Sequence, residues 1–176
     1  MSRFIVRRLG LLAGSTASLL ALIGAGVFLL PAASADRIVK GCTIVAHPTL
    51  QHGTNCAGAN LSRGDLSRVN LSYGNLTHAN LFRANLVRTN LYQANLSEAS
   101  LGGADLTHAR LSLGDLTNAN LSHANLSHAT ARAANLSHAN LFRADLSNAD
   151  LRNADLTDAR FCHTTMPDRH VNNSGC

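Results

Sequence analysis

A large apolar residue returns at every fifth position from Leu61 to Phe161, without a single insertion. Of these 21 positions, 19 hold leucine, and Ala131 and Phe161 are the exceptions. On an α-helix five residues advance by about 500°, so successive leucines would lie on all sides. In a flat strand an odd period would place alternate leucines on opposite faces. The period therefore predicts a chain that turns one corner per repeat and points every leucine inward.

The residues around each leucine favour such turns. A small residue, usually alanine, stands two positions before the leucine, and the position between them is mostly Asn or Asp. Asn, Asp, Ser, Thr and Gly favour turns because they bond their own backbone or tolerate unusual dihedral angles. The side chains that follow each leucine are then expected to point outward.

The segments "ANLSH", "ANLFR", "ADLTH" and "ADLSN" show that the repeat resembles the pentapeptide-repeat family, whose motif is A-(D/N)-L-x-x. The resemblance covers residues 59 to about 163. It implies an all-β fold, a right-handed quadrilateral parallel β-helix known as a pentapeptide-repeat solenoid. One repeat lies on each of four faces, which gives about 20 residues per coil and about five coils.

The start of the chain reads as an export signal. Arg3, Arg7 and Arg8 precede an apolar stretch from Leu11 to Leu30, and "PAASAD" places small residues at an A-x-A cleavage site. We expect cleavage after Ala35 and a secreted, periplasmic or cell-surface protein. The alternative is an uncleaved membrane anchor, because an apolar stretch of about 20 residues can span a bilayer.

The chain is thus expected to have four parts. Residues 1–35 are the signal peptide, 36–58 an N-terminal cap, 59–163 the β-helix and 164–176 a C-terminal cap or tail. The four cysteines, Cys42, Cys56, Cys162 and Cys176, read as disulfides in an exported chain, and three pairings are possible. On the coil that the family resemblance implies, Cys56 and Cys162 lie near opposite ends. The resemblance therefore implies Cys42–Cys56 and Cys162–Cys176, each closing an end cap and contributing roughly 3 kcal/mol.

Four outward arginines stand out. If 20 residues make a coil, then Arg63, Arg83, Arg68 and Arg88 occupy two adjacent faces of the first two coils. We call this set the arginine corner, and it could bind phosphate or carboxylate groups of a cell-wall polymer, a lipid headgroup or a nucleic acid. The alternative is a solvated surface whose charge is diluted by Asp65.

Histidines also recur with the repeat, but five residues correspond to one face, so neighbouring copies point in different directions. His108 and His128 are expected to stack one coil apart, with His123 across the corner. These three could share a zinc or copper ion, although a closed structural zinc site needs four ligands. The alternative is that they are ordinary solvent-facing side chains, and no cofactor is expected.

Catalysis is not expected either, because Ser, His and Asp come with the repeat and occupy convex faces. No insertion between 61 and 161 could build a pocket, whereas active sites are usually concave. The chain is therefore not predicted to be an enzyme.

The best-known members of the family resemble DNA and protect or inhibit type II topoisomerases inside the cell. This chain carries an export signal and a net charge of +5, which becomes +2 without the three arginines of residues 1–35. A type II topoisomerase is therefore not the expected partner. We expect an exported structural or protein-interaction module, built as a disulfide-capped β-helical rod. The alternative is a surface protein that binds an anionic cell-envelope polymer, a nucleic acid or a metal ion through its Arg and His faces.

Overall fold

The computed structural model describes residues 37–39, 42–45, 48–49 and 53–176. The expected signal peptide, its cleavage site and the alternative membrane anchor lie outside these residues. Within the described ranges, no helix has the length and apolar character needed to cross a bilayer.

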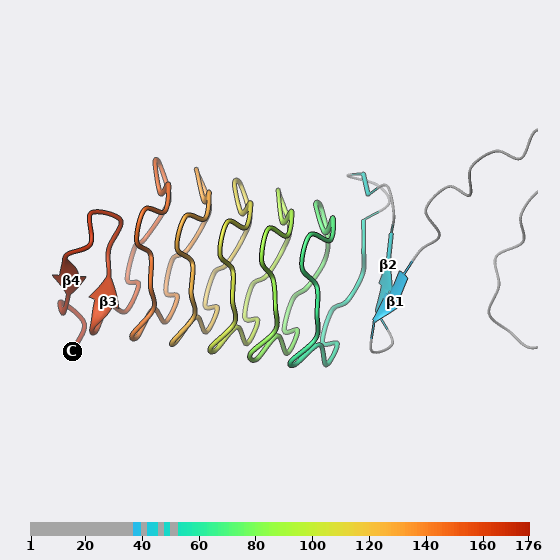
Figure 1. The fold of residues 1–176 in the computed structure, drawn as a ribbon, viewed down its shortest axis with the longest axis horizontal. Helices are drawn as coiled ribbons and strands as arrows, with labels where there is room; N and C mark the ends of the chain where they lie inside the picture. Colours follow the sequence, from blue (N-terminus) through green and yellow to red (C-terminus); the bar gives the residue numbers. More distant parts are fainter. Residues whose placement is uncertain (1–36, 40–41, 46–47, 50–52) are drawn as a thin grey trace, which may run out of the picture. The chain divides into compact units, whose positions relative to one another are not determined.

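The repeat region is a coil in which one residue of each five-residue segment pairs with the residue 20 positions later. Parallel bridges run from Asn55↔Asn75 to Asp145↔Thr165 and advance by five residues each time. The amide of Leu61 donates to the carbonyl of Asn80 (2.8 Å), and the amide of Asn80 donates back to the carbonyl of Ala59 (2.9 Å). Four five-residue segments therefore complete one coil, and successive coils stack in register (Figure 1).

A tight turn separates each segment from the next. The residue three positions after each leucine donates its amide back to the leucine carbonyl, as from Ala79 to Leu76 at 3.0 Å. The Asn or Asp before the leucine stabilises the same turn, because its side-chain oxygen accepts the amide two residues on. Asn60 accepts from Ser62 at 3.2 Å, and Asp65 accepts from Ser67 at 3.1 Å. Because every segment ends in a turn, each contains a single bridged residue and no long strand forms in the repeat.

The leucines fill the centre of the coil. Every leucine of the repeat from Leu61 to Leu146 is buried, with at most 1% of its surface exposed. Ala131 is equally buried, and the alanines two positions before the leucines pack beside this column. The last residues of the column, Leu151, Leu156 and Phe161, are only partly buried. The core is therefore closed along most of its length and more open near the C-terminal end.

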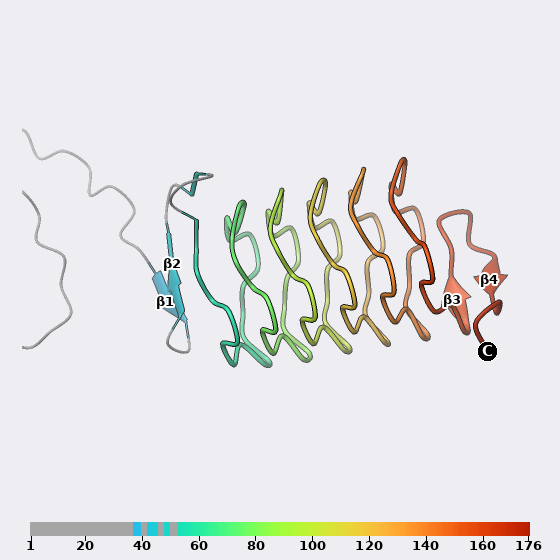
Figure 2. The same cartoon turned by 180° about the vertical axis from the view of Figure 1, so that it is seen from behind.

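Four short strands lie outside the repeat. β1 (Arg37–Val39) pairs antiparallel with β2 (Cys42–Ile44), and β3 (Thr164–Thr165) pairs antiparallel with β4 (Val171–Asn172). Figure 2 shows the two hairpins at opposite ends of the coils. One disulfide joins β2 to Cys56 of the first coil, and the other joins the two residues that flank the β3–β4 hairpin, Cys162 and Cys176.

The disulfides are Cys42–Cys56 and Cys162–Cys176, with Cα atoms 5.3 Å and 4.9 Å apart. This is the pairing that the family resemblance implied. Cys56 stands five residues before Leu61 and so occupies the leucine position of its own segment, where it is 3% exposed. Among the described residues, the first bridge of the coil ladder is at Asn55, inside the stretch that the sequence assigns to the N-terminal cap.

Candidate functional site

The backbone conformation of the turns determines which side chains point outward and are available for binding. The second residue after each leucine, from Arg63 to His163, has a positive φ between 50° and 65°. A positive φ at the third residue is what a type II turn requires. This backbone directs the side chain away from the leucine column, so the arginines and histidines singled out in the sequence all stand on the outside. The sequence indicated that these side chains point outward, but it did not indicate that their backbone is left-handed. Gly103 and Asn118, which occupy the same position in their segments, were a signal for positive φ.

The four residues of the arginine corner are exposed and lie in two neighbouring columns. Arg63 donates its amide to the carbonyl of Phe82, and Arg68 donates its amide to the carbonyl of Val87, so each lies beside the next arginine of its column. Coils at the usual strand spacing are about 4.8 Å apart. Asp65 lies between the columns, where its carboxylate accepts a hydrogen bond from Asn85 Nδ2 at 3.1 Å. The corner is thus a basic surface with one acidic group inside it.

The structure brings two of the three candidate metal-binding histidines together. The rings of His108 and His128 stack with centroids 5.0 Å apart and planes inclined by 22°. His123 instead meets the ring of Phe142, on the next coil of the same face, edge-on at 5.4 Å. His123 therefore belongs to an aromatic contact on the adjacent face.

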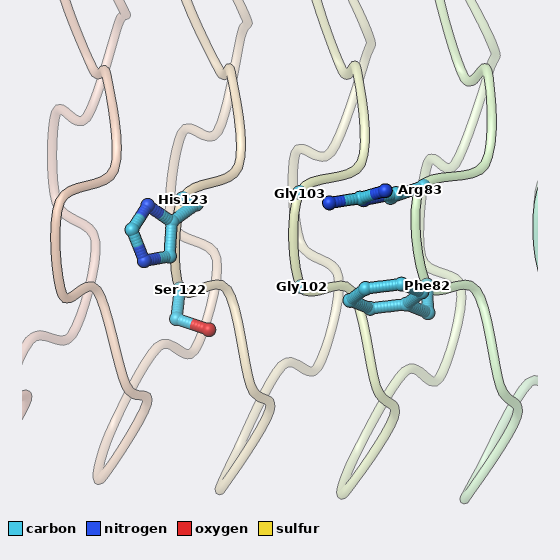
Figure 3. Close-up of a pocket in the computed structure, with 6 residues that line it drawn as sticks. All are labelled: Phe82, Arg83, Gly102, Gly103, Ser122 and His123. Carbon is cyan, nitrogen blue, oxygen red and sulfur yellow. The ribbon is translucent and has the colours of Figure 1, made fainter.

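A shallow hollow of about 360 Å³ interrupts the face that carries Arg83 and His123. We call it the glycine notch, and six residues line it: Phe82, Arg83, Gly102, Gly103, Ser122 and His123. In Figure 3, Phe82 and Arg83 lie side by side on one flank, and Ser122 and His123 lie on the other. The sequence analysis singled out Arg83 and His123 but not the notch.

The two glycines create the notch because they leave both outward positions of one five-residue segment without a side chain. A Cβ atom at Gly102 would lie 3.3 Å from Phe82 Cδ2, and one at Gly103 would lie 3.3 Å from Arg83 Cγ. Phe82 and Arg83 lean into this space, with the Arg83 guanidinium carbon 5.2 Å from the centre of the Phe82 ring. The same cation–π contact recurs at Arg143 and Phe142, also at 5.2 Å. The signal in the sequence was the Gly-Gly pair in "LGGADL".

Another face carries a compact ion pair. Asp150 accepts hydrogen bonds from the guanidinium groups of Arg152 and Arg132. The hydrogen bond from Arg152, followed by that from Arg132, holds the pKa of the Asp150 carboxyl well below its ordinary value. The charges of Arg132 and Arg152 are therefore partly neutralised by Asp150, which makes these two arginines less suited to binding an external anion.

Comparison with known families gives one match. The pentapeptide repeat family, described as "Pentapeptide repeats", matches residues 52–86, 75–112, 84–122, 114–148 and 132–166. Together these ranges cover well over half of the chain. A comparison with curated protein sequences finds no match.

Several solved structures are similar to the chain. The pentapeptide repeat protein Rfr23 from the cyanobacterium Cyanothece 51142 is 37% identical over 54% of this chain and 62% of its own, with a TM-score of 0.43. A pentapeptide repeat protein from the Arabidopsis thaliana thylakoid lumen is 29% identical over 61% of this chain and 64% of its own, with a TM-score of 0.33. The chain thus spans less than two thirds of the length of both. QnrB1, a plasmid-mediated fluoroquinolone resistance protein, is 19% identical over 61% of this chain and 67% of its own, with a TM-score of 0.35.

Proposed function

Because this chain belongs to the pentapeptide repeat family, we propose that it acts as an exported interaction module, a right-handed β-helix of about five coils capped by disulfides. The observation that carries this proposal is the regular display of side chains. Every turn presents outward residues at the same place on its face, and the 20-residue register repeats them one coil apart. Such columns form a preorganised surface, which lowers the entropic cost of binding an extended partner.

Two features support a role outside the cytoplasm. Residues 1–35 have the sequence of an export signal, with small residues at the cleavage site. Both disulfides favour an oxidising compartment, because cytosolic thiols are kept reduced. We therefore place the protein in the periplasm, at the cell surface or in the medium.

The proposed function is binding and not catalysis. The residues of the glycine notch stand on the outer side of three successive coils, and the hollow that they line is shallow. Active sites are usually clefts that enclose most of the substrate and exclude water. A surface of this kind suits a macromolecule that lies across several coils.

The arginine corner favours an anionic partner as the second, more specific candidate. Its four exposed guanidinium groups come from adjacent columns of successive coils. Arginine binds carboxylate and phosphate groups with two parallel hydrogen bonds. A polymer with regularly spaced anionic groups, such as a cell-envelope polymer, matches this arrangement, and a nucleic acid shares the same chemistry.

The proposal can be tested by affinity capture from cell-envelope and extracellular fractions with the exported chain as bait. The first residue of the recovered chain should be Asp36 by mass spectrometry, and a retained Met1 in the membrane fraction would contradict export. We expect capture of a defined partner by the unmodified chain and loss of that partner with Arg68→Glu and Arg83→Glu together. Glu98 has the same backbone conformation as these arginines, so glutamate is compatible with the turn.

A matched control removes the same charge elsewhere. Arg110→Glu and Arg152→Glu lie outside the corner, and Asp150 keeps its ion pair with Arg132 in this variant. The control should retain the partner. Equal loss from both variants would point to a diffuse charge effect, and the arginine corner would then not be the binding surface.

A further inference from the structure

The C-terminal disulfide has a histidine beside it. Nδ1 of His163 lies 3.3 Å from Sγ of Cys162 and 3.9 Å from Sγ of Cys176. All three candidate ligand atoms lie within 4.8 Å of one another. Cys162 is buried, whereas His163 and Cys176 are exposed. Among the residues that the structure describes, no other group of three His, Cys, Asp or Glu side chains is this closely gathered.

The backbone around these three residues is held in place from both sides. The carbonyl of Cys162 accepts the amide of Arg143 at 2.8 Å, which joins it to the preceding coil. The amide of His163 donates to Asn173 Oδ1 at 2.9 Å, and this joins the histidine to the segment that carries Cys176. The backbone at Cys162 and His163 is therefore held within the cap.

The distances fit a metal once the disulfide is open. In a tetrahedral site with Zn–S bonds of about 2.3 Å and Zn–N bonds of about 2.0–2.1 Å, the nitrogen and each sulfur are about 3.5 Å apart. The two observed Nδ1–Sγ distances, 3.3 Å and 3.9 Å, bracket this value. The two sulfurs would have to separate to about 3.8 Å, the corresponding edge of the tetrahedron. Cys176 can make this movement, because its side chain is exposed and the disulfide no longer restrains it.

We propose that the reduced C-terminal cap binds one thiophilic d¹⁰ cation, Zn(II) or Cu(I), through Cys162, His163 and Cys176. Two thiolates and an imidazole are the ligands that such ions prefer, and three protein ligands leave a fourth position open. The disulfide and the metal site are then alternative states of the same cap.

Reduction converts the disulfide state of the cap into the metal-binding state. A dithiol reductant supplies two electrons and two protons, the S–S bond breaks to give the thiols of Cys162 and Cys176, and the reductant becomes a disulfide. Metal binding then displaces the two thiol protons, because the thiolate is the ligand. In the reverse direction an external disulfide accepts two electrons from the thiolates of Cys162 and Cys176 and leaves as two thiols after taking up two protons, so that the Cys162–Cys176 bond forms again and the cation is released.

The test uses the full chain reduced with a phosphine, which does not compete strongly for the metal, and Co(II) as a spectroscopic substitute for Zn(II). We expect one equivalent of Co(II) with thiolate charge-transfer and tetrahedral d–d absorption, displaced by Zn(II). Titration of Cu(I) against a chromophoric chelator then shows which of the two ions the site prefers. The oxidised chain should give no such absorption.

Three variants identify the ligands. His163→Asn should weaken metal binding by more than about tenfold. Asparagine fits the backbone, because Asn148 occupies the same position three segments earlier with a φ of 56°. Cys162→Ser with Cys176→Ser should abolish the signal, whereas Cys42→Ser with Cys56→Ser should retain it. Full affinity in His163→Asn, or loss of the signal in the N-terminal variant alone, would overturn the proposal.

A second measurement does not depend on variants that could fail to fold. Zn(II) should slow re-formation of Cys162–Cys176 by more than about tenfold and leave Cys42–Cys56 unaffected, as followed by mass spectrometry of trapped thiols. Equal rates with and without Zn(II) at the C-terminal disulfide would contradict the proposed site.

Discussion

The turn residues with positive φ adopt a backbone conformation that costs conformational free energy. Non-glycine residues with positive φ lie in a sparsely populated region, at a cost of about 1–2 kcal/mol for most residue types. This chain places arginine, histidine, glutamine and glutamate there, and Gly103 is the exception among its neighbours. Outward side chains are thus retained at some expense of stability, which is consistent with their use in binding.

Substitution of Gln93 tests this cost at one turn. Gln93 has a φ of 53° and is exposed. Gln93→Gly should raise the free energy of unfolding by about 1 kcal/mol, because glycine adopts positive φ without steric strain. Gln93→Val should lower it by about 1–2 kcal/mol, because a β-branched residue is poorly tolerated there. Chemical denaturation with the disulfides intact measures both, and a stabilising valine would show that the turn is not left-handed.

The sequence allowed the outward position of these residues to be predicted, but not their neighbours in space. His108 and His128 were expected to stack, and they do, because a fixed 20-residue coil determines which residues share a column. The contact of His123 with Phe142 was missed, since ring packing depends on rotamers that the repeat does not specify. The position of His163 beside the cystine was missed for the same reason, although it directly follows Cys162.

Each five-residue segment combines a buried and an exposed position within three residues. Leu111 is fully buried in the column, while Leu113 in the same turn is 47% exposed. Leu111→Ala should therefore destabilise the protein by about 2–5 kcal/mol, because it removes buried apolar surface and leaves a cavity. Leu113→Ala is the matched control and should change the free energy of unfolding by less than about 0.5 kcal/mol. Thermal or chemical unfolding measures the stability of both variants. Similar losses of stability in the two variants would mean that the leucine column is not the core.

The elements of the repeat were predictable because the period of five admits only a chain that turns at every segment. The ends were less predictable. The repeat gives no information on the hairpins β1–β2 and β3–β4, which follow no five-residue period. The sequence also contained no sign that Asn55 takes part in the ladder, because Cys56 stands at the leucine position of that segment.

For the molecule as a whole, the proposal that the coil acts as an interaction module is most specific at the arginine corner, the proposed anion-binding surface. The most direct measurement is the affinity of the exported chain for poly(glycerol phosphate) as a function of salt concentration. Binding should weaken steeply as salt is added, because each phosphate contact releases counterions. Arg68→Glu with Arg83→Glu should reduce affinity at low salt by more than about tenfold and flatten the salt dependence, while Arg110→Glu with Arg152→Glu should have little effect. Binding that is independent of salt, or equally weakened by both pairs of substitutions, would contradict this proposal.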